Sequence, residues 1–331
     1  MTTAAAGTTE RVPLLDIEGL SVAFGGLTVV DGVSLRVGQG EVLGIVGESG
    51  CGKSVTAQAA MGLLPPVARM TAKRLDLAGE SILGASERRM QGLRGSAMSM
   101  IFQEPMTALN PVLTIGRQIG ETLVRHGVVS GGAVRMRAAE LLARVGIPSP
   151  VDKLDEYPHQ LSGGMRQRVM IAIAIACNPK LLFADEPTTA LDVTIQAQIL
   201  ELLRELQQEY RMGIVLISHD LGVVSSFADR VMVMYSGRVV EDADADAIFA
   251  RPTHPYTRGL LESLPSATQD RPRLKAIPGT VPPPFDLPSG CRFRTRCAIA
   301  QPVCATTDPP RVEVGPAHGA ACLTPYREAI A

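Results

Sequence analysis

GESGCGKS, residues 47–54 of a chain of 331 residues, fits the pattern G-x-x-x-x-G-K-S/T, a loop whose backbone N–H groups surround the phosphates of a nucleotide. Its glycines lack a Cβ, so the backbone can turn sharply and approach an anion closely. Lys53 can reach the β- and γ-phosphates as a point charge, and the Ser54 hydroxyl can ligate Mg²⁺. The predicted nucleotide contacts of this segment are Gly47, Glu48, Ser49, Gly50, Cys51, Gly52, Lys53, Ser54 and Val55.

The flanking sequence has the composition that such a loop needs. Residues 41–46 (EVLGIV) read as a buried strand, and residues 55–61 (VTAQAAM) continue as a helix. The positive end of a helix dipole favours bound phosphate at that point. The alternative is a chance glycine-rich turn, and the order strand, loop, helix argues against it.

Size and composition restrict the class of protein. The length suits one large and one small unit, and 46% hydrophobic with 20% charged residues is ordinary globular composition. A net charge of −1 gives no overall basic field for nucleic acid or anionic lipid. No apolar run approaches the ~20 residues of a membrane span, and residues 1–10 lack the features of a signal peptide. We therefore expect a cytoplasmic protein that reaches a membrane only through partners.

Three further apolar runs end in polar residues that can face the phosphate site. One ends at Gln103, whose amide can bond to a metal-bound water or the γ-phosphate. A second ends at Asp185, which can hold Mg²⁺, followed by Glu186, which can polarise a water for attack on phosphorus. The third ends at His219, either a structural histidine or a sensor of the γ-phosphate.

A second helix start resembles an anion site. Ser162, Gly163 and Gly164 open a predicted helix over residues 166–177, and free N–H groups at such a start can bind phosphate. Two such sites in one chain indicate a nucleotide held between two subunits. The alternative, Ser162 as an ordinary N-cap, accounts for the serine but not for both glycines.

The remaining segments predict the surrounding architecture. Residues 14–24 and 29–37 alternate apolar and polar side chains and indicate an antiparallel β region, in which Phe24 either packs or stacks on a purine. Residues 115–126 and 134–145 predict two amphipathic helices between the phosphate loop and Ser162. Residues 231–241 predict a hairpin, and the proline-rich sequence from residue 266 predicts an irregular tail.

Together these features resemble the ATP-binding subunits of ABC transporters over nearly the whole chain. The signature reads LSGGM, where LSGGQ is the commoner form. The matched elements are Walker A (47–54), the Q-loop (Gln103), the signature (161–165), Walker B (181–185) with Glu186 in the catalytic position, the D-loop (190–192, ending in Asp192), the switch histidine (His219) and the adenine-stacking aromatic (Phe24).

A closer resemblance is to the oligopeptide/dipeptide (peptide/nickel) permease family. It is carried by FQEPMTALNP at 102–111, PTHPYT at 252–257 and IPG at 277–279. It implies an α/β fold: a P-loop NTPase cassette with a RecA-like core, an antiparallel β region and a helical subdomain at about 104–178, plus a small irregular Cys-rich extension. The implied units are a flexible tail at 1–13, the ATP-binding domain at 14–265 and the extension at 266–331.

The resemblance implies the motor subunit of a bacterial importer for oligopeptides or dipeptides, with nickel, glutathione or another small solute as alternatives. The implied partners are a second ATPase subunit (more often a sister chain), two transmembrane permease subunits and an extracytoplasmic substrate-binding protein, but no nucleic acid. The implied location is the cytoplasmic face of the plasma membrane. A non-transport ABC ATPase is the rival, but such proteins usually carry two cassettes or a coiled coil and basic surfaces.

The same resemblance assigns the nucleotide chemistry. Two subunits close head to tail over two ATP molecules. Lys53 and the loop amides hold the phosphates, while Ser54, Gln103 and Asp185 organise Mg²⁺. Ser162 and Gly164 complete the partner's site. Glu186 orients the attacking water, and His219 contacts the γ-phosphate.

Four cysteines near the C-terminus have the spacing C-x5-C-x6-C-x17-C. Four thiolates suit an iron–sulfur cluster or Zn²⁺, and the resemblance favours a 4Fe–4S cluster, with zinc next and free thiols last. Arg292, Arg294 and Arg296 are expected to offset the negative charge of such a cluster. Cys51 and Cys177 are expected to be plain small residues. The predicted cluster ligands are Cys291, Cys297, Cys304 and Cys322.

Overall fold

The computed structural model describes residues 12–189, 191–264 and 276–326. Most of the predicted tail at 1–13, Ala190 of the predicted D-loop and the start of the predicted extension at 266–275 lie outside these ranges.

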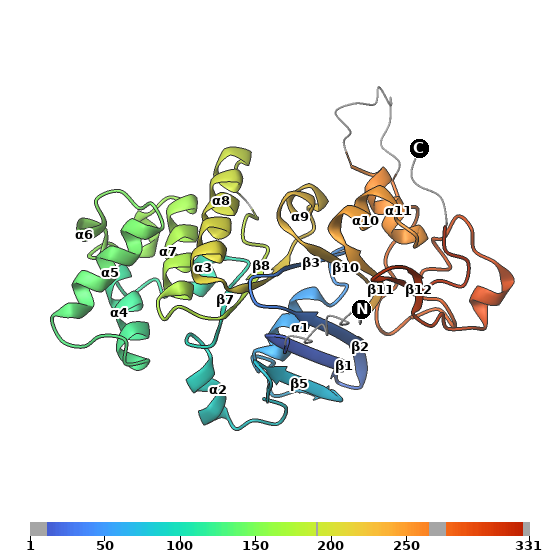
Figure 1. Ribbon diagram of the computed structural model, residues 1–331, viewed down its shortest axis with the longest axis horizontal. Helices are drawn as coiled ribbons and strands as arrows, with labels where there is room; N and C mark the ends of the chain where they lie inside the picture. The colour runs from blue at the N-terminus through green and yellow to red at the C-terminus, as the bar shows by residue number, and fades with distance from the viewer. Residues whose placement is uncertain (1–11, 190, 265–275, 327–331) are drawn as a thin grey trace, which may run out of the picture.

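An eight-stranded sheet runs through the centre of the molecule (Figure 1). Its strands β7, β8, β9, β3 and β10 are parallel neighbours, and β11, β13 and β12 continue it in antiparallel fashion. The parallel strands are short runs of buried apolar residues, as expected for strands covered on both faces. In spatial order the strands are β12 (Val312–Gly315), β13 (His318–Ala320), β11 (Arg238–Asp244), β10 (Arg230–Tyr235), β3 (Val42–Val46), β9 (Gly213–Ile217), β8 (Leu181–Asp185) and β7 (Met98–Ile101).

The predicted antiparallel β region is confirmed as a second sheet. Its first hairpin turns at Gly25 and Gly26, both at positive φ, so that Phe24 pairs with Leu27. The sheet has the order β2-β1-β5-β6, with β4 also paired to β1. Its strands are β1 (Leu15–Phe24), β2 (Leu27–Val37), β4 (Ala68–Thr71), β5 (Arg74–Leu77) and β6 (Glu80–Ser81).

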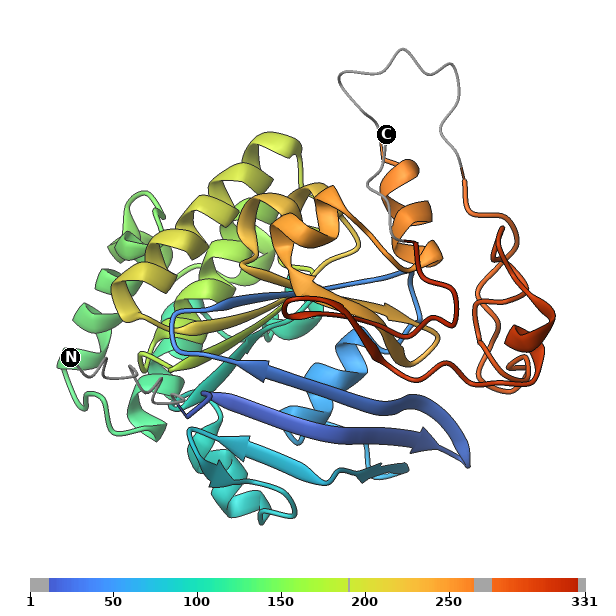
Figure 2. The same cartoon turned by 45° about the vertical axis from the view of Figure 1, so that its right-hand side comes forward.

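Alternating side chains along the central strands face two separate hydrophobic cores. Leu43 and Ile45 belong to the core shared with the antiparallel sheet and α1 (Lys53–Ala60). Val42 and Val46 belong to the core on the helical side. Successive side chains of a strand point to opposite faces, so one apolar run serves both cores. Figure 2 shows the antiparallel sheet below the central sheet and the long helices above it.

The helical side confirms the predicted insertion between the phosphate loop and Ser162. Helices α4, α5 and α7 contact one another, and Figure 1 shows them at the left of the molecule. Within the described residues, no helix is both long and apolar enough to span a bilayer. The helices are α2 (Glu87–Leu93), α3 (Pro105–Ala108), α4 (Ile115–Arg125), α5 (Ala133–Arg144), α6 (Pro150–Lys153), α7 (Gly163–Ile175), α8 (Val193–Tyr210), α9 (Leu221–Phe227), α10 (Ala245–Ala250) and α11 (Pro255–Glu262), with 3₁₀ turns at Pro158–Gln160 and Pro302–Ala305.

The C-terminal segment is less irregular than predicted, because β12 and β13 form a hairpin on the free edge of β11. Glu241 pairs with Ala320 and Asp242 with Gly319. These strands are only four and three residues long, and their partner β11 lies far back in the sequence. A short strand of this kind depends on its edge partner rather than on its own hydrophobic pattern, so the local sequence did not reveal it.

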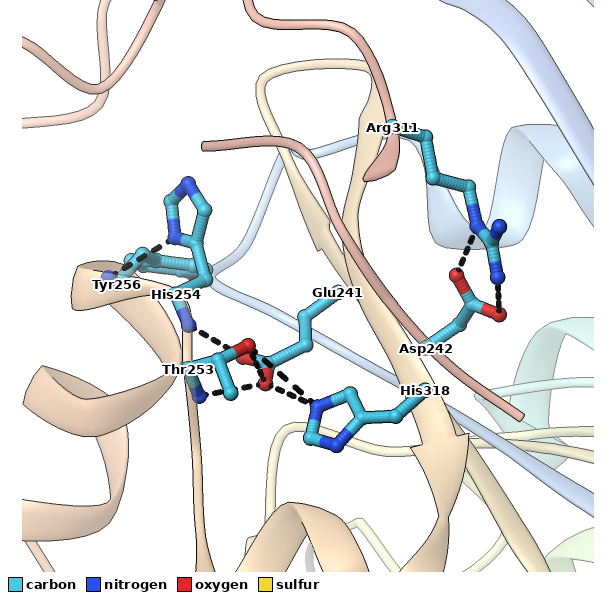
Figure 3. A network of polar contacts seen from close by, with 7 residues as sticks. All are labelled: Glu241, Asp242, Thr253, His254, Tyr256, Arg311 and His318. Carbon is cyan, nitrogen blue, oxygen red and sulfur yellow. Dashed lines mark hydrogen bonds and ion pairs between the residues drawn. The ribbon is translucent and has the colours of Figure 1, made fainter. Parts of the chain in front are cut away.

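A buried carboxylate fastens this hairpin to the rest of the chain (Figure 3). Glu241 is fully buried and accepts hydrogen bonds from the Thr253 N–H (2.7 Å), the Thr253 hydroxyl (2.7 Å) and the His254 N–H (3.0 Å). The His318 Nε2 lies 2.7 Å from the same carboxylate. Arg311 adds a two-pronged bond to Asp242, at 2.7 and 2.9 Å. Glu241 and Asp242 of β11 are therefore both satisfied by residues that follow the strand in the sequence.

Candidate functional site

The glycine-rich loop joins β3 to α1 as predicted. Gly47 has φ +150°, and a Cβ there would collide with the carbonyl oxygen of Met234. Gly50 and Gly52 also have positive φ, at +77° and +99°. The loop conformation therefore requires glycine at these positions, which is the physical meaning of the sequence pattern.

Lys53 is folded back over the loop. Its ammonium donates hydrogen bonds to the carbonyl oxygens of Gly47 (2.8 Å) and Glu48 (3.1 Å), and the side chain is buried. A buried ammonium at the start of a helix, beside backbone N–H groups, makes a strongly anion-attracting position. Cys51 is fully buried against it, and burial raises the pKa of its thiol. This agrees with the prediction that Cys51 is a plain small residue.

Ser54 and Asp185 meet although they are far apart in the sequence. The Ser54 hydroxyl donates to Asp185 Oδ1 at 2.9 Å. Asp185 ends β8 and is almost fully buried, and this burial is the main cause that raises its pKa. A buried carboxylate whose charged form is disfavoured is a site that gains from a nearby cation. The sequence predicts that both residues help to hold Mg²⁺, and the structure brings them into contact.

Glu186 is the centre of a polar cluster one residue further on. Its carboxylate accepts a hydrogen bond from the Gln103 amide (3.1 Å) and from the Thr189 hydroxyl (2.8 Å). The Nδ1 of His219 lies 3.2 Å from the same oxygen. Because β7, β8 and β9 are neighbouring parallel strands, their carboxyl ends bring Gln103, Glu186 and His219 to one edge of the sheet.

The backbone of Glu186 is itself unusual. Its φ of +46° is left-handed, a conformation that costs a non-glycine residue about 1 kcal/mol or more. The Glu186 N–H donates to the Ile217 carbonyl at 2.9 Å, which ties the strained residue to β9. Thr189 was not among the predicted site residues. Its position three residues after Glu186, where a hydroxyl can reach back, is the signal that could have identified it.

Phe24 lies at the end of β1, where it is partly buried and packs against the core between the two sheets. Adenine stacking by this ring stays a prediction.

The signature segment lies apart from the phosphate loop of the same chain. Figure 1 shows α7 beside α4 and α5, whereas α1 lies beneath β3. Ser162 caps α7 by accepting from the Met165 N–H at 3.3 Å, and Asp192 caps α8 by accepting from the Ile195 N–H at 3.0 Å. A Cβ on Gly164 would lie 3.0 Å from Ile195, so the two helix starts are packed together. Ser162, Gly163, Gly164 and Asp192 thus form one surface separate from Lys53.

The residues present suit Mg²⁺. The candidate donors are the Ser54 hydroxyl, the Asp185 carboxylate and the Gln103 amide oxygen, all hard oxygen ligands of the kind that Mg²⁺ prefers. The burial that raises the pKa of Asp185 is the observation in favour of a cation here.

The predicted metal cluster of the C-terminal extension is wrong. Within residues 12–189, 191–264 and 276–326, no group of three or more Cys, His, Asp or Glu side chains is arranged to hold a metal ion. All four cysteines are free thiols. Burial raises the pKa of Cys291 and Cys297, and raises that of Cys322 to about 11.

The three arginines of this segment were predicted to offset the charge of a metal cluster, but they bond to other groups of the protein. Arg292 pairs with Asp31 and donates to the Ser236 carbonyl oxygen at 2.6 Å. Arg294 donates to the Ser289 carbonyl oxygen at 2.9 Å. Arg296 pairs with Glu48 in the phosphate loop. Two of the three therefore dock the extension onto the cassette.

A central parallel sheet that ends in a glycine-rich phosphate loop, a buried carboxylate beside its serine and a neighbouring glutamate defines a P-loop nucleoside triphosphatase. The family models refine this class: ABC transporter matches residues 30–189, and the C-terminal region of the oligopeptide/dipeptide transporters matches residues 240–304.

Curated relatives match over most of their length. The dipeptide transport ATP-binding protein DppD of Escherichia coli is 53% identical over 300 residues, 89% of this chain and 92% of the relative. DppD of Bacillus subtilis is 49% identical over 314 residues, 93% of this chain and 94% of the relative. The chain therefore belongs to the ATP-binding proteins of ABC transporters, in the oligopeptide/dipeptide transporter group, and it is an ABC-type ATPase.

Solved structures show the same cassette. CbiO1 of Clostridium perfringens, part of the ABC transporter complex cbiONQ, superposes with a TM-score of 0.61 at 29% identity, covering 72% of this chain and 90% of that one. The dimeric bacterial ABC transporter cassette MJ0796 superposes with a TM-score of 0.62 at 27% identity, covering 70% and 98%.

Proposed function

We propose that this chain is the ATP-hydrolysing motor subunit of a bacterial importer for dipeptides or oligopeptides. The observation that carries the proposal is its similarity, over about nine tenths of both chains, to relatives named as dipeptide transport ATP-binding proteins. The convergence of Gln103, Glu186 and His219 at the sheet edge supports an active ATPase rather than a passive nucleotide-binding module.

The residues divide the work on ATP. Lys53 exchanges its loop carbonyl partners for the β- and γ-phosphates, and the N–H groups of the loop and of α1 surround them. Phe24 stacks on the adenine. Glu186 orients the attacking water, and His219 contacts the γ-phosphate. Such catalysis depends on positioning and charge stabilisation rather than on covalent chemistry.

Ser54, Asp185 and Gln103 would hold Mg²⁺, which would offset the negative charge of the phosphates when it is bound. The Ser54–Asp185 hydrogen bond keeps two of these oxygen donors in place beforehand.

The separate surface at the starts of α7 and α8 serves a second cassette. Ser162, Gly163, Gly164 and Asp192 complete the nucleotide site of the partner when two subunits close head to tail. The dimeric arrangement of the similar cassette MJ0796 supports this pairing.

We infer that the partner ATPase is a sister chain. Two permease subunits hold the pair at the cytoplasmic face of the plasma membrane. An extracytoplasmic binding protein delivers the peptide. The proposed units are a tail at 1–13, the ATP-binding domain at 14–265 and the extension at 266–331.

The test is reconstitution of the full assembly in liposomes, with ATP hydrolysis and uptake of a labelled dipeptide measured together. We expect both to rise several-fold when the binding protein carries a dipeptide, and both to be lost with Lys53→Ala. Equal ATP turnover by the Lys53→Ala assembly would contradict the assigned phosphate site. Stimulation by nickel or glutathione instead of a peptide would contradict the proposed substrate class.

A further inference from the structure

The C-terminal extension reaches into the phosphate loop. Arg296, from the segment CRFRTRC at 291–297, presents both Nη atoms to the carboxylate of Glu48, at 2.6 and 2.9 Å. Its side chain is only 4% exposed, and its Nε donates to the Pro278 carbonyl oxygen at 2.9 Å. A two-pronged arginine–carboxylate pair is among the stronger and more directional contacts in proteins.

The backbone of the same loop residue is held from a second direction. The Glu48 N–H donates to the hydroxyl of Tyr256 at 2.8 Å. Tyr256 is fully buried, and its ring packs against Tyr235 (4.7 Å between centroids) and Phe293 (5.3 Å). Phe293 lies in the same CRFRTRC segment as Arg296. Residues from α11 and from the extension thus fix Glu48 at both its amide and its carboxylate.

Glu48 also contacts a residue that we expect to bind ATP. Its carbonyl oxygen accepts from Lys53, the lysine assigned to the phosphates. Its carboxylate is a negative charge inside a loop that must receive a highly negative triphosphate. Like charges at close range disfavour binding, and a neutralising partner removes that penalty. Arg296 supplies the neutralising charge and, with Pro278, fixes where the carboxylate lies.

We propose that Arg296 is a positioning residue for nucleotide binding, which acts through Glu48 and couples the docking of the C-terminal extension to the affinity for ATP. This inference rests on the phosphate site proposed above. It gives the C-terminal extension a role in nucleotide binding.

The experiment measures equilibrium binding of ATP and ADP to the full chain by calorimetry. Arg296→Ala leaves the Glu48 carboxylate unpaired, so we expect ATP to bind about tenfold more weakly, or about 1.4 kcal/mol. The loss is smaller for ADP, which carries less charge, and it shrinks at high salt. The double variant Glu48→Gln/Arg296→Ala removes the unpaired charge, and we expect its affinity to return to within about twofold of Glu48→Gln alone.

Arg292→Ala is the matched control, because Arg292 also docks the extension but does so through Asp31 and the Ser236 carbonyl oxygen. We expect it to lower stability and leave ATP affinity within about twofold. Should Arg296→Ala not fold, Arg296→Lys keeps the charge without the two-pronged geometry, and we expect about a threefold loss of affinity.

Two results would overturn the inference. One is wild-type ATP affinity in the Arg296 variant. The other is an equal loss for ATP and ADP that Glu48→Gln does not restore, which would mean that Arg296 acts by packing alone. Lys53→Ala separates this failure from that of the proposed phosphate site: if the lysine variant binds ATP as the wild type does, the site itself is wrongly assigned.

Discussion

The side-chain amide of Gln103 donates a hydrogen bond of 3.1 Å to the carboxylate of Glu186, which joins the ends of β7 and β8. An amide has both a donor and an acceptor end, so the oxygen of Gln103 can face a metal while its nitrogen stays on Glu186. Gln103 is followed by the helical insertion that contains α3, α4 and α5. A change at the proposed Mg²⁺ site would thereby be linked to the Glu186 carboxylate and to the segment through which we expect the permease to respond.

The first prediction concerns the charge of Glu186. Glu186→Gln keeps the size of the side chain and its ability to accept from Thr189, but it cannot polarise a water as a base does. We expect ATP affinity to stay within about twofold and hydrolysis to fall by about 10²- to 10⁴-fold. Calorimetry and phosphate release check the two parts. Glu201→Gln, an exposed acid on α8, is the control and should hydrolyse ATP normally; residual turnover above about a tenth in the Glu186 variant would contradict its role.

The second prediction separates two roles of Ser162. As the N-cap of α7 it accepts from the Met165 N–H, and Ser162→Ala should cost about 1 kcal/mol of stability. Ser162→Asn retains a capping oxygen and should keep that stability. If Ser162 also contacts the partner's ATP, both variants should lower hydrolysis by the assembled pair, on the order of a hundredfold. Full activity of Ser162→Asn would mean that the serine serves only as a cap.

Local sequence was enough to predict the strand ends of the site. Gln103, Asp185 and His219 each follow a short apolar run, and the parallel sheet then brings such ends to one edge without further information. The four-residue strand β12 and three-residue strand β13 were missed because they pair only with the distant edge of β11. The metal cluster predicted from the cysteine spacing was wrong for a related reason. The spacing carries no information about long-range contacts such as the pair of Arg296 with Glu48, 248 positions away.

The third prediction concerns the buried carboxylate of Glu241. Glu241→Ala leaves the donors of Thr253 and His254 and the ring of His318 without their shared acceptor (Figure 3). Removing one partner of a buried charged network costs about 3 to 5 kcal/mol. Urea unfolding of the full chain measures this change. Glu313→Ala is the control, because Glu313 pairs with Arg311 at the surface with 64% of its side chain exposed, and it should cost less than about 0.5 kcal/mol. Equal stability of the two variants would mean that the network contributes nothing.

The last prediction is a pH dependence that arises at His254. The ring is almost fully buried, and its Nδ1 accepts from the Tyr256 N–H at 3.1 Å at the start of α11. Burial lowers the pKa of His254 from 6.5 to about 4, against the opposing charge of Glu241. Between pH 6.5 and about 4, His254 is therefore protonated in the unfolded chain and neutral in the folded chain. Stability from this residue is therefore complete above pH 6.5 and is lost as the pH falls toward about 4.

His254→Asn isolates this effect, since asparagine can cap α11 with its oxygen but does not titrate. Carboxylates such as Glu241 titrate in both proteins, so the difference between them reports on the histidine. We expect the wild type to lose about 3 kcal/mol more than the variant over this range, from the size of the pKa change. Urea unfolding at about pH 7.5 and about pH 4.5 should show most of that difference. A gap between the two proteins that does not change with pH would mean that the imidazole has the same pKa in the folded and the unfolded chain, and that burial does not control its charge.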